Sequence, residues 1–437
     1  MGAIQAKKIV IVDGYSMGRE LAHDLHTRGA ELFHLRSTPE PPPVFRAGIN
    51  ATPYRADLGY LGAEEEAART ILAMNVDHVL AGSELGVSYA ERLAHLAGAP
   101  TNLYPLIAER RNKFRMIAAL HRRGLLAAEQ TLVDSENEAV AWAQRYGNWP
   151  LVVKPLDSAG SDNVTICRSL EEVRTACRKA FGAHTVFAQP NRQLIVQSWL
   201  DGTQYIVNTV SRDGRHFMTD AWRVNIRLLP GYAMVMEDFE LLAPESNVAS
   251  ALLRYTFDAL DALGIVNGTA HSELKWTARG PAMIETGARL MGAAMDRDSY
   301  AAAGLKTQSI YHALDIMQPE WMNDMRRRSD RYLPGRHLTK VFFAFAGDGV
   351  ITGVDGLERL LELPTFHAIY RTLPVGTRVH LTTDSTGWGG AIYLVHEDAA
   401  LIKRDREQIR AWDAQGLLYE IDYEAADMPA ETSAAAC

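Results

Sequence analysis

The feature that most constrains the fold of this chain is the regular alternation of strand-like and helix-like segments over its first hundred residues. Residues 8–13 form a short apolar run typical of a buried strand, and residues 17–28 carry apolar side chains at helical spacing. A second strand is expected at 31–35, followed by a helix, a strand and a helix at 63–74, 76–81 and 86–96. Strands that alternate with helices in this way predict a small α/β domain with a parallel sheet.

The rest of the chain requires further packed units. The chain has 437 residues, whereas one domain usually holds roughly 100 to 200. We expect an N-terminal α/β domain over residues 1–105, a central region over 106–330 and a C-terminal β-rich subdomain with its tail over 331–437. In the central region the periodicity predicts strands at 131–133, 149–155, 164–167, 194–199, 268–276 and 282–285, and helices at 111–120, 136–146, 170–181 and 248–263. Antiparallel strands are expected over 203–225, where Arg-Asp-Gly at 212–214 marks a hairpin.

Charge and composition exclude several classes of partner. The formal net charge is -8 at pH 7, so the chain offers no broad attraction for nucleic acid. No stretch approaches the roughly 20 apolar residues of a membrane-spanning helix. The three cysteines, Cys167, Cys177 and Cys437, are spaced for neither a zinc site nor a disulfide framework. We therefore expect a cytoplasmic protein that binds neither nucleic acid nor membranes.

A lysine followed by small residues indicates phosphate binding. Lys154 leaves the apolar strand expected at 149–155, and residues 158–161 read Ser-Ala-Gly-Ser. An ammonium group neutralises phosphate charge, and small residues let backbone N–H groups approach the oxygens. The segment is not a Walker A loop, because no Gly-Lys-Ser or Gly-Lys-Thr ends it and a strand follows. A surface lysine before an ordinary turn is the alternative.

Two glutamates are expected to share a second candidate site. His271 and Glu273 would point to one face of the strand at 268–276, and a turn at 277–281 would bring Glu285 back beside Glu273. Adjacent carboxylates repel each other unless a cation lies between them, and magnesium accepts carboxylates together with nucleotide phosphates. An exposed hairpin with ordinary charges is the alternative.

An arginine follows this pair at a useful spacing. Arg289 lies four positions after Glu285 and could stabilise charge on transferred phosphoryl and tetrahedral oxygens. The small residues Gly287, Ala288 and Gly292 around it favour a crowded interior site over an exposed turn.

The order of these residues resembles that of the ATP-grasp superfamily: Lys113, Lys154, residues 197–205, Glu273, Glu285 and Arg289. The resemblance implies that both lysines bind nucleotide phosphates, that Glu273 and Glu285 hold magnesium, and that Arg289 is catalytic. It also implies that a loop closes over the β- and γ-phosphates, formed by Ser158, Ala159, Gly160 and Ser161.

The same resemblance assigns the adenosine site. It implies that the stretch containing Gln197, Ser198 and Leu200 binds adenine largely through its backbone, and that Gln204 holds the ribose hydroxyls. Family members usually have glutamate at the positions of Gln197 and Gln204. An amide can still form hydrogen bonds with hydroxyls, so Gln204 can hold the ribose although it carries an amide in place of a carboxylate.

The resemblance covers nearly the whole chain. Residues 1–105, with the sequence GYSMG at 14–18, resemble the α/β domain that precedes ATP-grasp cores, residues 125–196 would form a mobile lid, and residues 347–416 resemble the C-terminal subdomain. The implied fold class is α/β with an α+β core. GYSMG lacks the GxGxxG spacing of a dinucleotide-binding fold, which is the weaker alternative.

Within the superfamily, the sequence is similar to L-amino-acid ligases, which make dipeptides. Gly287 stands where many members, D-alanine ligases among them, place a metal-binding asparagine, whereas His-Ser-Glu at 271–273 and Glu-Thr-Gly-Ala-Arg at 285–289 match the L-amino-acid ligases. In that group the residues after the arginine help to line the amino-acid site, so the small Ala293 implies room for a sizeable side chain.

Three further residues are candidates for substrate contact. His271 could accept a proton from the attacking amine, although a histidine on a packed strand is more often structural. Trp222 and Arg223 could reach the substrate from an expected strand, although aromatic residues on strands more often belong to the core.

The resemblance implies a ligase that uses ATP and magnesium. Two magnesium ions are expected, and manganese could replace them. A carboxylate would be activated as an acyl phosphate and joined to an amine, with two amino acids as the small-molecule substrates. The alternatives are loading of an amino acid onto a carrier protein, ligation of an unusual biosynthetic acid, a biotin-dependent carboxylase and a non-catalytic ATP-binding protein. Because relatives are commonly dimers, a homodimer is expected.

Overall fold

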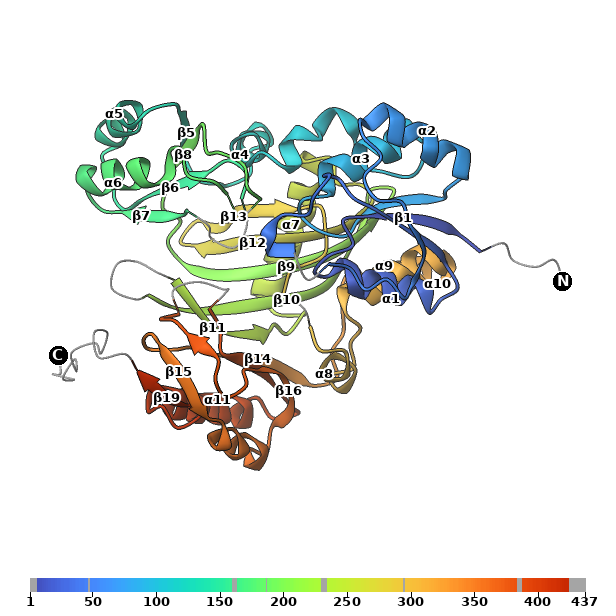
Figure 1. The fold of residues 1–437 in the computed structure, drawn as a ribbon. Coiled ribbons are helices and arrows are strands. Elements are labelled where there is room, and N and C mark those ends of the chain that lie inside the picture. The colour runs from blue at the N-terminus through green and yellow to red at the C-terminus, as the bar shows by residue number, and fades with distance from the viewer. Residues whose placement is uncertain are drawn as a thin grey trace. The chain divides into compact units, whose positions relative to one another are not determined.

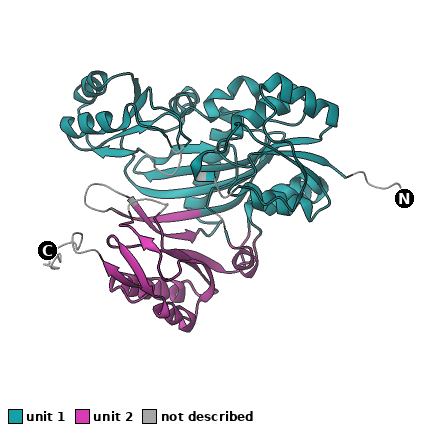
Figure 2. Cartoon of the chain, viewed as in Figure 1, with its two compact units in different colours: residues 1–221, 242–295, 306–332 teal, residues 222–241, 296–305, 333–437 magenta. Residues whose placement is uncertain are grey.

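The computed structural model describes residues 6–45, 48–158, 163–185, 187–228, 234–293, 295–382 and 387–423. The chain forms two compact units (Figure 2). Unit 1 holds residues 1–221, 242–295 and 306–332, and unit 2 holds residues 222–241, 296–305 and 333–437. Each unit therefore joins segments that are far apart in the sequence.

Unit 1 begins with the predicted parallel sheet (Figure 1). Its strand order is β3-β2-β1-β4, and the three neighbouring pairs are parallel. The α/β prediction is therefore confirmed. The strands are β1 (Lys8–Val12), β2 (Glu31–Leu35), β3 (Tyr54–Asp57) and β4 (His78–Ala81), and the helices are α1 (Gly18–His26), the short η1 (Pro43–Phe45), α2 (Glu64–Met74) and α3 (Val87–Leu96).

Strand β1 is apolar and buried from Ile9 to Val12 because both faces of its sheet are covered. Ile9 and Ile11 pack in one cluster with residues of α1 and of α9 (Gln308–Met317). Val10 and Val12 point the other way and pack with residues of α2 and α3. Helix α9 and the following α10 (Pro319–Arg328) are absent from the sequence-based expectation.

The region predicted to form a lid is a second four-stranded sheet of unit 1, in the order β5-β8-β6-β7. Its helices α5 and α6 lie side by side and share an apolar core with the sheet (Figure 1). Both helices start at a serine, Ser135 and Ser169, whose hydroxyl accepts the N–H of Glu138 and Glu172 respectively, as in a capping box. The elements are β5 (Gln130–Val133), α5 (Glu136–Tyr146), β6 (Leu151–Pro155), β7 (Thr165–Cys167), α6 (Leu170–Ala180) and β8 (Leu194–Ser198).

The core sheet of unit 1 follows the order β13-β12-β9-β10. Asp213 and Gly214 have φ of 50° and 74°, the left-handed conformation that a two-residue hairpin requires, and this confirms the predicted hairpin. The turn between β12 and β13 is residues 278–279, shorter than the expected 277–281, because both strands extend into it. The elements are η2 (Tyr104–Leu106), η3 (Ala108–Arg110), α4 (Lys113–Arg122), β9 (Thr203–Arg212), β10 (Arg215–Leu228), α7 (Asn247–Ala262), β12 (Gly268–Thr277) and β13 (Gly280–Gly287).

Unit 2 contains two sheets. The second half of β10 pairs with β11, which is followed by β14, β18 and β16, and a smaller sheet has the order β17-β15-β19. The predicted tail at 425–437 lies outside the described residues. The elements are β11 (Met234–Leu241), α8 (Arg297–Ala302), β14 (His337–Phe343), β15 (Gly349–Gly353), η4 (Asp355–Glu362), β16 (Phe366–Thr372), β17 (Arg378–Val379), β18 (Gly390–His396), α11 (Ala399–Ala414) and β19 (Glu420–Tyr423).

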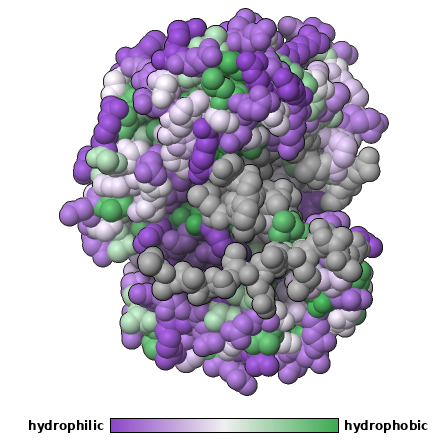
Figure 3. Space-filling model, turned by 90° about the vertical axis from the view of Figure 1, so that its left-hand side faces the viewer, coloured by the Kyte–Doolittle hydropathy of each residue, from purple (hydrophilic) through white to green (hydrophobic). Residues whose placement is uncertain are grey.

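None of the helices in the described ranges is long and apolar enough to cross a membrane. On the face drawn in Figure 3, hydrophilic residues predominate and hydrophobic residues appear in small groups.

A buried ion pair ties the parallel domain to the core of unit 1. The Arg110 side chain is fully buried, and its Nε and Nη2 donate to Glu91 at 2.7–3.0 Å. Its Nη1 donates to the Leu263 carbonyl at 2.8 Å. We expect Arg110→Ala to lower the free energy of unfolding by about 3–5 kcal/mol, because Glu91 is left buried without its cation. Urea unfolding followed by circular dichroism measures this, and a loss of only about 1 kcal/mol would contradict it.

Candidate active site

The two predicted glutamates lie directly opposite each other. Glu273 on β12 is the register partner of Glu285 on β13. A β-bulge follows Glu273 in this pair of strands. Directly opposed residues have Cβ atoms about 5 Å apart, so the two carboxylates enter the same space.

Lys113 reaches this carboxylate pair from the first turn of α4. Its Nζ lies 2.8 Å from Glu285 Oε2 and donates to the Ser158 carbonyl at 2.9 Å. Burial alone would lower the pKa of Lys113, but the carboxylates of Glu285 and Glu84 together outweigh burial and raise it. Lys113 therefore stays charged and joins the acidic hairpin to the start of the small-residue loop.

Lys154 is the second cation of the site, and it lies on β6. Its side chain is only 5% exposed. Burial lowers the pKa of Lys154 to about 8, an effect that Glu285 and Glu273 partly offset and that Lys113 adds to. The ammonium group is therefore charged at neutral pH and loses its proton in mildly alkaline solution.

This pKa predicts how ATP affinity depends on pH. If Lys154 binds a phosphate, the dissociation constant of Mg-ATP should rise above about pH 8, because the neutral amine attracts phosphate less. In Lys154→Met, binding should be roughly 10- to 100-fold weaker at neutral pH, since a charge-assisted hydrogen bond is lost. The variant's affinity should also be independent of pH between about 7 and about 9.5. Fluorescent-nucleotide titration measures both, and a wild-type profile that is flat over this range would exclude the role.

The proposed adenosine residues are part of the strands that frame the site. Gln197 on β8 is buried and donates to Gln130 Oε1 at 2.9 Å, and Ser198 Oγ accepts the N–H of Glu129 at 3.0 Å. Leu200 is half-buried after the same strand. Gln204 on β9 donates to Glu273 Oε2 at 3.1 Å, so its amide faces the carboxylate pair.

The phosphate loop is described only in part. Ser158 is buried, whereas Ala159, Gly160 and Ser161 lie outside the described residues. Their predicted contacts with phosphates stay predictions.

Arg289 lies just beyond β13 and is held by a residue that sequence reasoning missed. Its Nε lies 2.6 Å from Glu84 Oε2, and its Nη1 donates to the Leu290 carbonyl at 2.9 Å. Glu84 follows β4 in the sequence Gly-Ser-Glu. Its place beyond the carboxyl end of a parallel strand, the edge where such sheets bind ligands, is the signal that could have found it.

His271 is fixed by a chain of polar side chains. Asn208 donates through its amide to Asp220 Oδ1 at 2.6 Å, and its oxygen therefore accepts from His271 Nδ1 at 2.9 Å. His271 Nε2 lies 3.4 Å from Glu273 Oε1. His271 therefore contacts one member of the carboxylate pair, Glu273, from the same face of β12.

The remaining substrate candidates occupy different surroundings. Trp222 is fully buried and packs on Tyr300 with ring centroids 6.0 Å apart, whereas Arg223 is exposed; both belong to unit 2. Ala293 in unit 1 is half-buried and follows Gly292, whose carbonyl accepts from Ser16 Oγ at 3.3 Å. Their contact with substrate remains a prediction.

The donor set fits magnesium bound together with a nucleotide. Among the described residues, no group of three or more histidines, cysteines, aspartates or glutamates could hold a metal ion alone. Two opposed carboxylates are what a magnesium ion uses when phosphates and water complete its octahedron. Lys113 and Gln204 direct their donors at these same carboxylates, which shows the excess negative charge.

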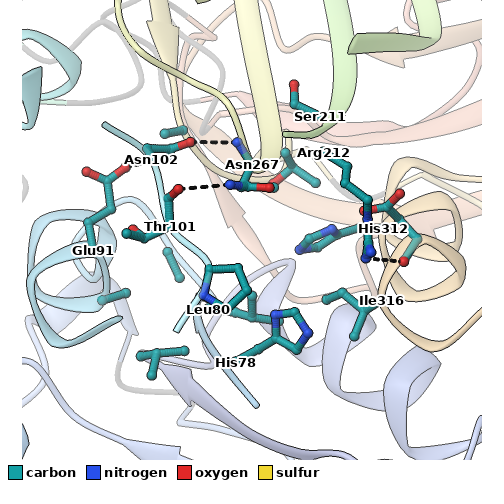
Figure 4. Close-up of a pocket in the computed structure, with 18 of the residues that line it drawn as sticks. His78, Leu80, Glu91, Thr101, Asn102, Ser211, Arg212, Asn267, His312 and Ile316 are labelled. Carbon is teal, nitrogen blue, oxygen red and sulfur yellow. Dashed lines mark hydrogen bonds and ion pairs between the residues drawn. The ribbon is translucent and has the colours of Figure 1, made fainter. Parts of the chain in front are cut away.

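A separate cavity in unit 1 contains none of the predicted site residues. It measures about 170 Å³ and lies between β4, the start of β12 and α9 (Figure 4). His78 and His312 point into it, and burial lowers the pKa of each to about 4. Arg212 also lines it and is tied to Asp315 at 3.1 Å.

The chain is similar in sequence to one known family and to two characterised proteins. The family described as "Carbamoyl-phosphate synthase L chain, ATP binding domain" matches residues 111–219. Dapdiamide A synthase of Enterobacter agglomerans is 29% identical over 412 residues, which cover 93% of this chain and 96% of that protein. The L-arginine-specific L-amino acid ligase of Bacillus subtilis is 22% identical over 51% of this chain and 53% of its own length.

The fold agrees with these matches. The crystal structure of an L-amino acid ligase from Bacillus licheniformis superposes with a TM-score of 0.73 at 16% identity, covering 97% of this chain and all of that one. The chain therefore has the ATP-grasp fold, matches an ATP-binding domain family over residues 111–219, and is similar in sequence to proteins named as a synthase and a ligase.

Proposed function

We propose that this ATP-grasp carboxylate–amine ligase joins two amino acids into a dipeptide through an acyl-phosphate intermediate. The observation that carries the proposal is the convergence of two opposed carboxylates, the buried Lys154, the half-buried Lys113 and an arginine within unit 1. The carboxylates are Glu273 and Glu285, and Lys113 contacts the second of them at 2.8 Å. A nucleotide triphosphate bound with a divalent cation matches this charge pattern.

In the first step, an oxygen of the substrate carboxylate attacks the γ-phosphorus of ATP. The bond from that phosphorus to the β–γ bridging oxygen breaks, and ADP leaves. Lys113 and Lys154 neutralise the phosphate oxygens, while Arg289 faces the charge that develops on the transferred group. Magnesium, when bound at Glu273 and Glu285, supplies further neutralisation of that charge.

In the second step, the amine of the other substrate attacks the acyl carbon. The carbon–oxygen bond to phosphate breaks, phosphate leaves and the nitrogen loses a proton. His271 lies beside Glu273 and is the group proposed to accept that proton. The lid, residues 125–196, would exclude water, which would otherwise hydrolyse the acyl phosphate.

The names of the relatives support amino acids as substrates. One is named for dapdiamide A synthesis and the other for specificity toward L-arginine. The half-buried Ala293 lies four residues after Arg289, and we propose that its small side chain makes room for a sizeable substrate side chain. Which two amino acids are joined is the open variable of the proposal.

The test is phosphate release from ATP across all pairs of the twenty amino acids, with products identified by mass spectrometry. Release that requires both amino acids and gives their dipeptide supports the proposal. Turnover that needs one amino acid and a carrier protein, or an acid outside the twenty, would overturn dipeptide synthesis but would still support an ATP-dependent ligase. If Mg-ATP binds but none of these substrates gives turnover, the protein would be a non-catalytic ATP-binding protein.

A further inference from the structure

Glu84 is a half-buried carboxylate surrounded by cations of the site. It lies between β4 and α3, and 18% of its side chain is exposed. One oxygen contacts Arg289 Nε at 2.6 Å, and the other pairs with Arg111 Nη1. Burial would raise the pKa of Glu84, but Arg289, Arg111 and Lys113 together lower it to about 2. Glu84 is therefore a fixed negative charge at every working pH.

Arg111 extends this contact toward the phosphate loop. Its other terminal nitrogen pairs with Asp157, the residue before Ser158, and its guanidinium lies 6.0 Å from the centre of the Phe187 ring. A continuous series of ion pairs therefore runs Arg289–Glu84–Arg111–Asp157. Because Lys113 donates to the Ser158 carbonyl, both ends of this series border groups that we assign to phosphate binding.

The unusual glycine at position 287 has a steric reason. A β-carbon at Gly287 would lie 2.9 Å from Glu84 Oε2, closer than real Cβ atoms approach a neighbour. Gly287 does not adopt the left-handed conformation, so space rather than backbone freedom favours glycine: a β-carbon would displace the Glu84 carboxylate from its present place beside Arg289. The carboxylate of Glu84 thus occupies the volume that an asparagine at this position, common in the superfamily, would need.

We infer that Glu84 is a positioning residue that orients Arg289 for phosphoryl transfer and couples it, through Arg111, to Asp157 at the start of the phosphate loop. The inference rests on the proposed role of Arg289. A planar guanidinium held at Nε can turn only about that contact, so its outer nitrogens keep one direction. Displacement by about 1 Å costs roughly 100-fold in rate.

The first test is Glu84→Gln, with Glu91→Gln as the matched control. Both changes remove the charge of a glutamate paired with an arginine, but Glu91 pairs with Arg110 outside the site. We expect Glu84→Gln to lower kcat about 100-fold with little change in the KM for ATP, whereas Glu91→Gln lowers the unfolding midpoint and leaves kcat of the folded enzyme unchanged. Equal kcat losses in both variants would overturn the inference.

The second test asks whether Glu84 acts through Arg289. When Arg289 is already lysine, adding Glu84→Gln should cause no further loss of kcat. Likewise, Gly287→Ala should lower kcat of the wild-type enzyme, but adding it to Glu84→Ala should cause no further loss. Fully additive losses would show that Glu84 acts elsewhere. If Glu84→Gln fails to fold, Glu84→Asp, which keeps the charge and shortens the reach, replaces it in the same cycle.

The third measurement needs no amino-acid substrate. In arginine-labelled protein, the Nε–H resonance of Arg289, assigned by its loss in Arg289→Lys, should be protected and shifted in the wild type and in Glu91→Gln. It should move toward free arginine in Glu84→Gln. An unmoved resonance overturns the inference even if dipeptide synthesis is found, and a moved one sustains it if only the amino-acid substrates prove wrong.

Discussion

Replacing Glu285 with glutamine is expected to lower kcat by roughly 10²- to 10³-fold while the protein stays folded. Glutamine keeps the shape of the side chain and removes the charge that Lys113 contacts at 2.8 Å. The change leaves Lys113 and Lys154 facing Glu273 alone and removes one of the two carboxylates that fit magnesium. Phosphate release under saturating ATP and substrates measures the effect, and Glu65→Gln on the exposed face of α2 is the control.

The same variant has a second, independent consequence. Glu285 raises the pKa of Lys154 against the effect of burial, so its removal should move that pKa below about 8. If Lys154 binds a phosphate in its charged form, as proposed, the pH at which Mg-ATP affinity begins to fall should shift in the acidic direction. A large loss of kcat with an unchanged pH profile would show that Glu285 does not act on Lys154.

Replacing Arg289 with lysine is expected to lower kcat about 10³-fold, although the positive charge is kept. Lysine has no planar group that can bind Glu84 through one nitrogen, donate to the Leu290 carbonyl through a second and direct the third at a phosphoryl group. The dissociation constant of Mg-ATP should change little, since the arginine acts on the transferred group. Stopped-flow phosphate release and nucleotide titration separate these two quantities.

A control for this substitution lies on the same hairpin. Arg279 is exposed in the turn between β12 and β13, and Arg279→Lys should leave both quantities unchanged. If Arg289→Lys instead weakened Mg-ATP binding and left kcat intact, Arg289 would be a ground-state phosphate ligand, and its assignment to the transition state would be wrong.

Several parts of the site could be predicted because their signals are local. Lys154 ends an apolar strand, and a short turn returns Glu285 beside Glu273, so strand periodicity alone brought the two carboxylates together. The helices α5 and α6 begin with Ser-x-x-Glu sequences that fix their first turns. Helices α9 and α10 were missed, and they join unit 1 from the distant segment 306–332.

The sequence by itself determined the parallel sheet, the acidic hairpin and the order of the charged residues, because periodicity, turns and spacing act over a few neighbouring positions. Only the tertiary structure decided the partners of those charges. Glu84 meets Arg289 across 205 positions of sequence, and Gln204 meets Glu273 across 69. An ion pair depends on the distance between two atoms in space, and packing of separate segments sets that distance. For the same reason, the need for glycine at position 287 became visible only once Glu84 was found beside it.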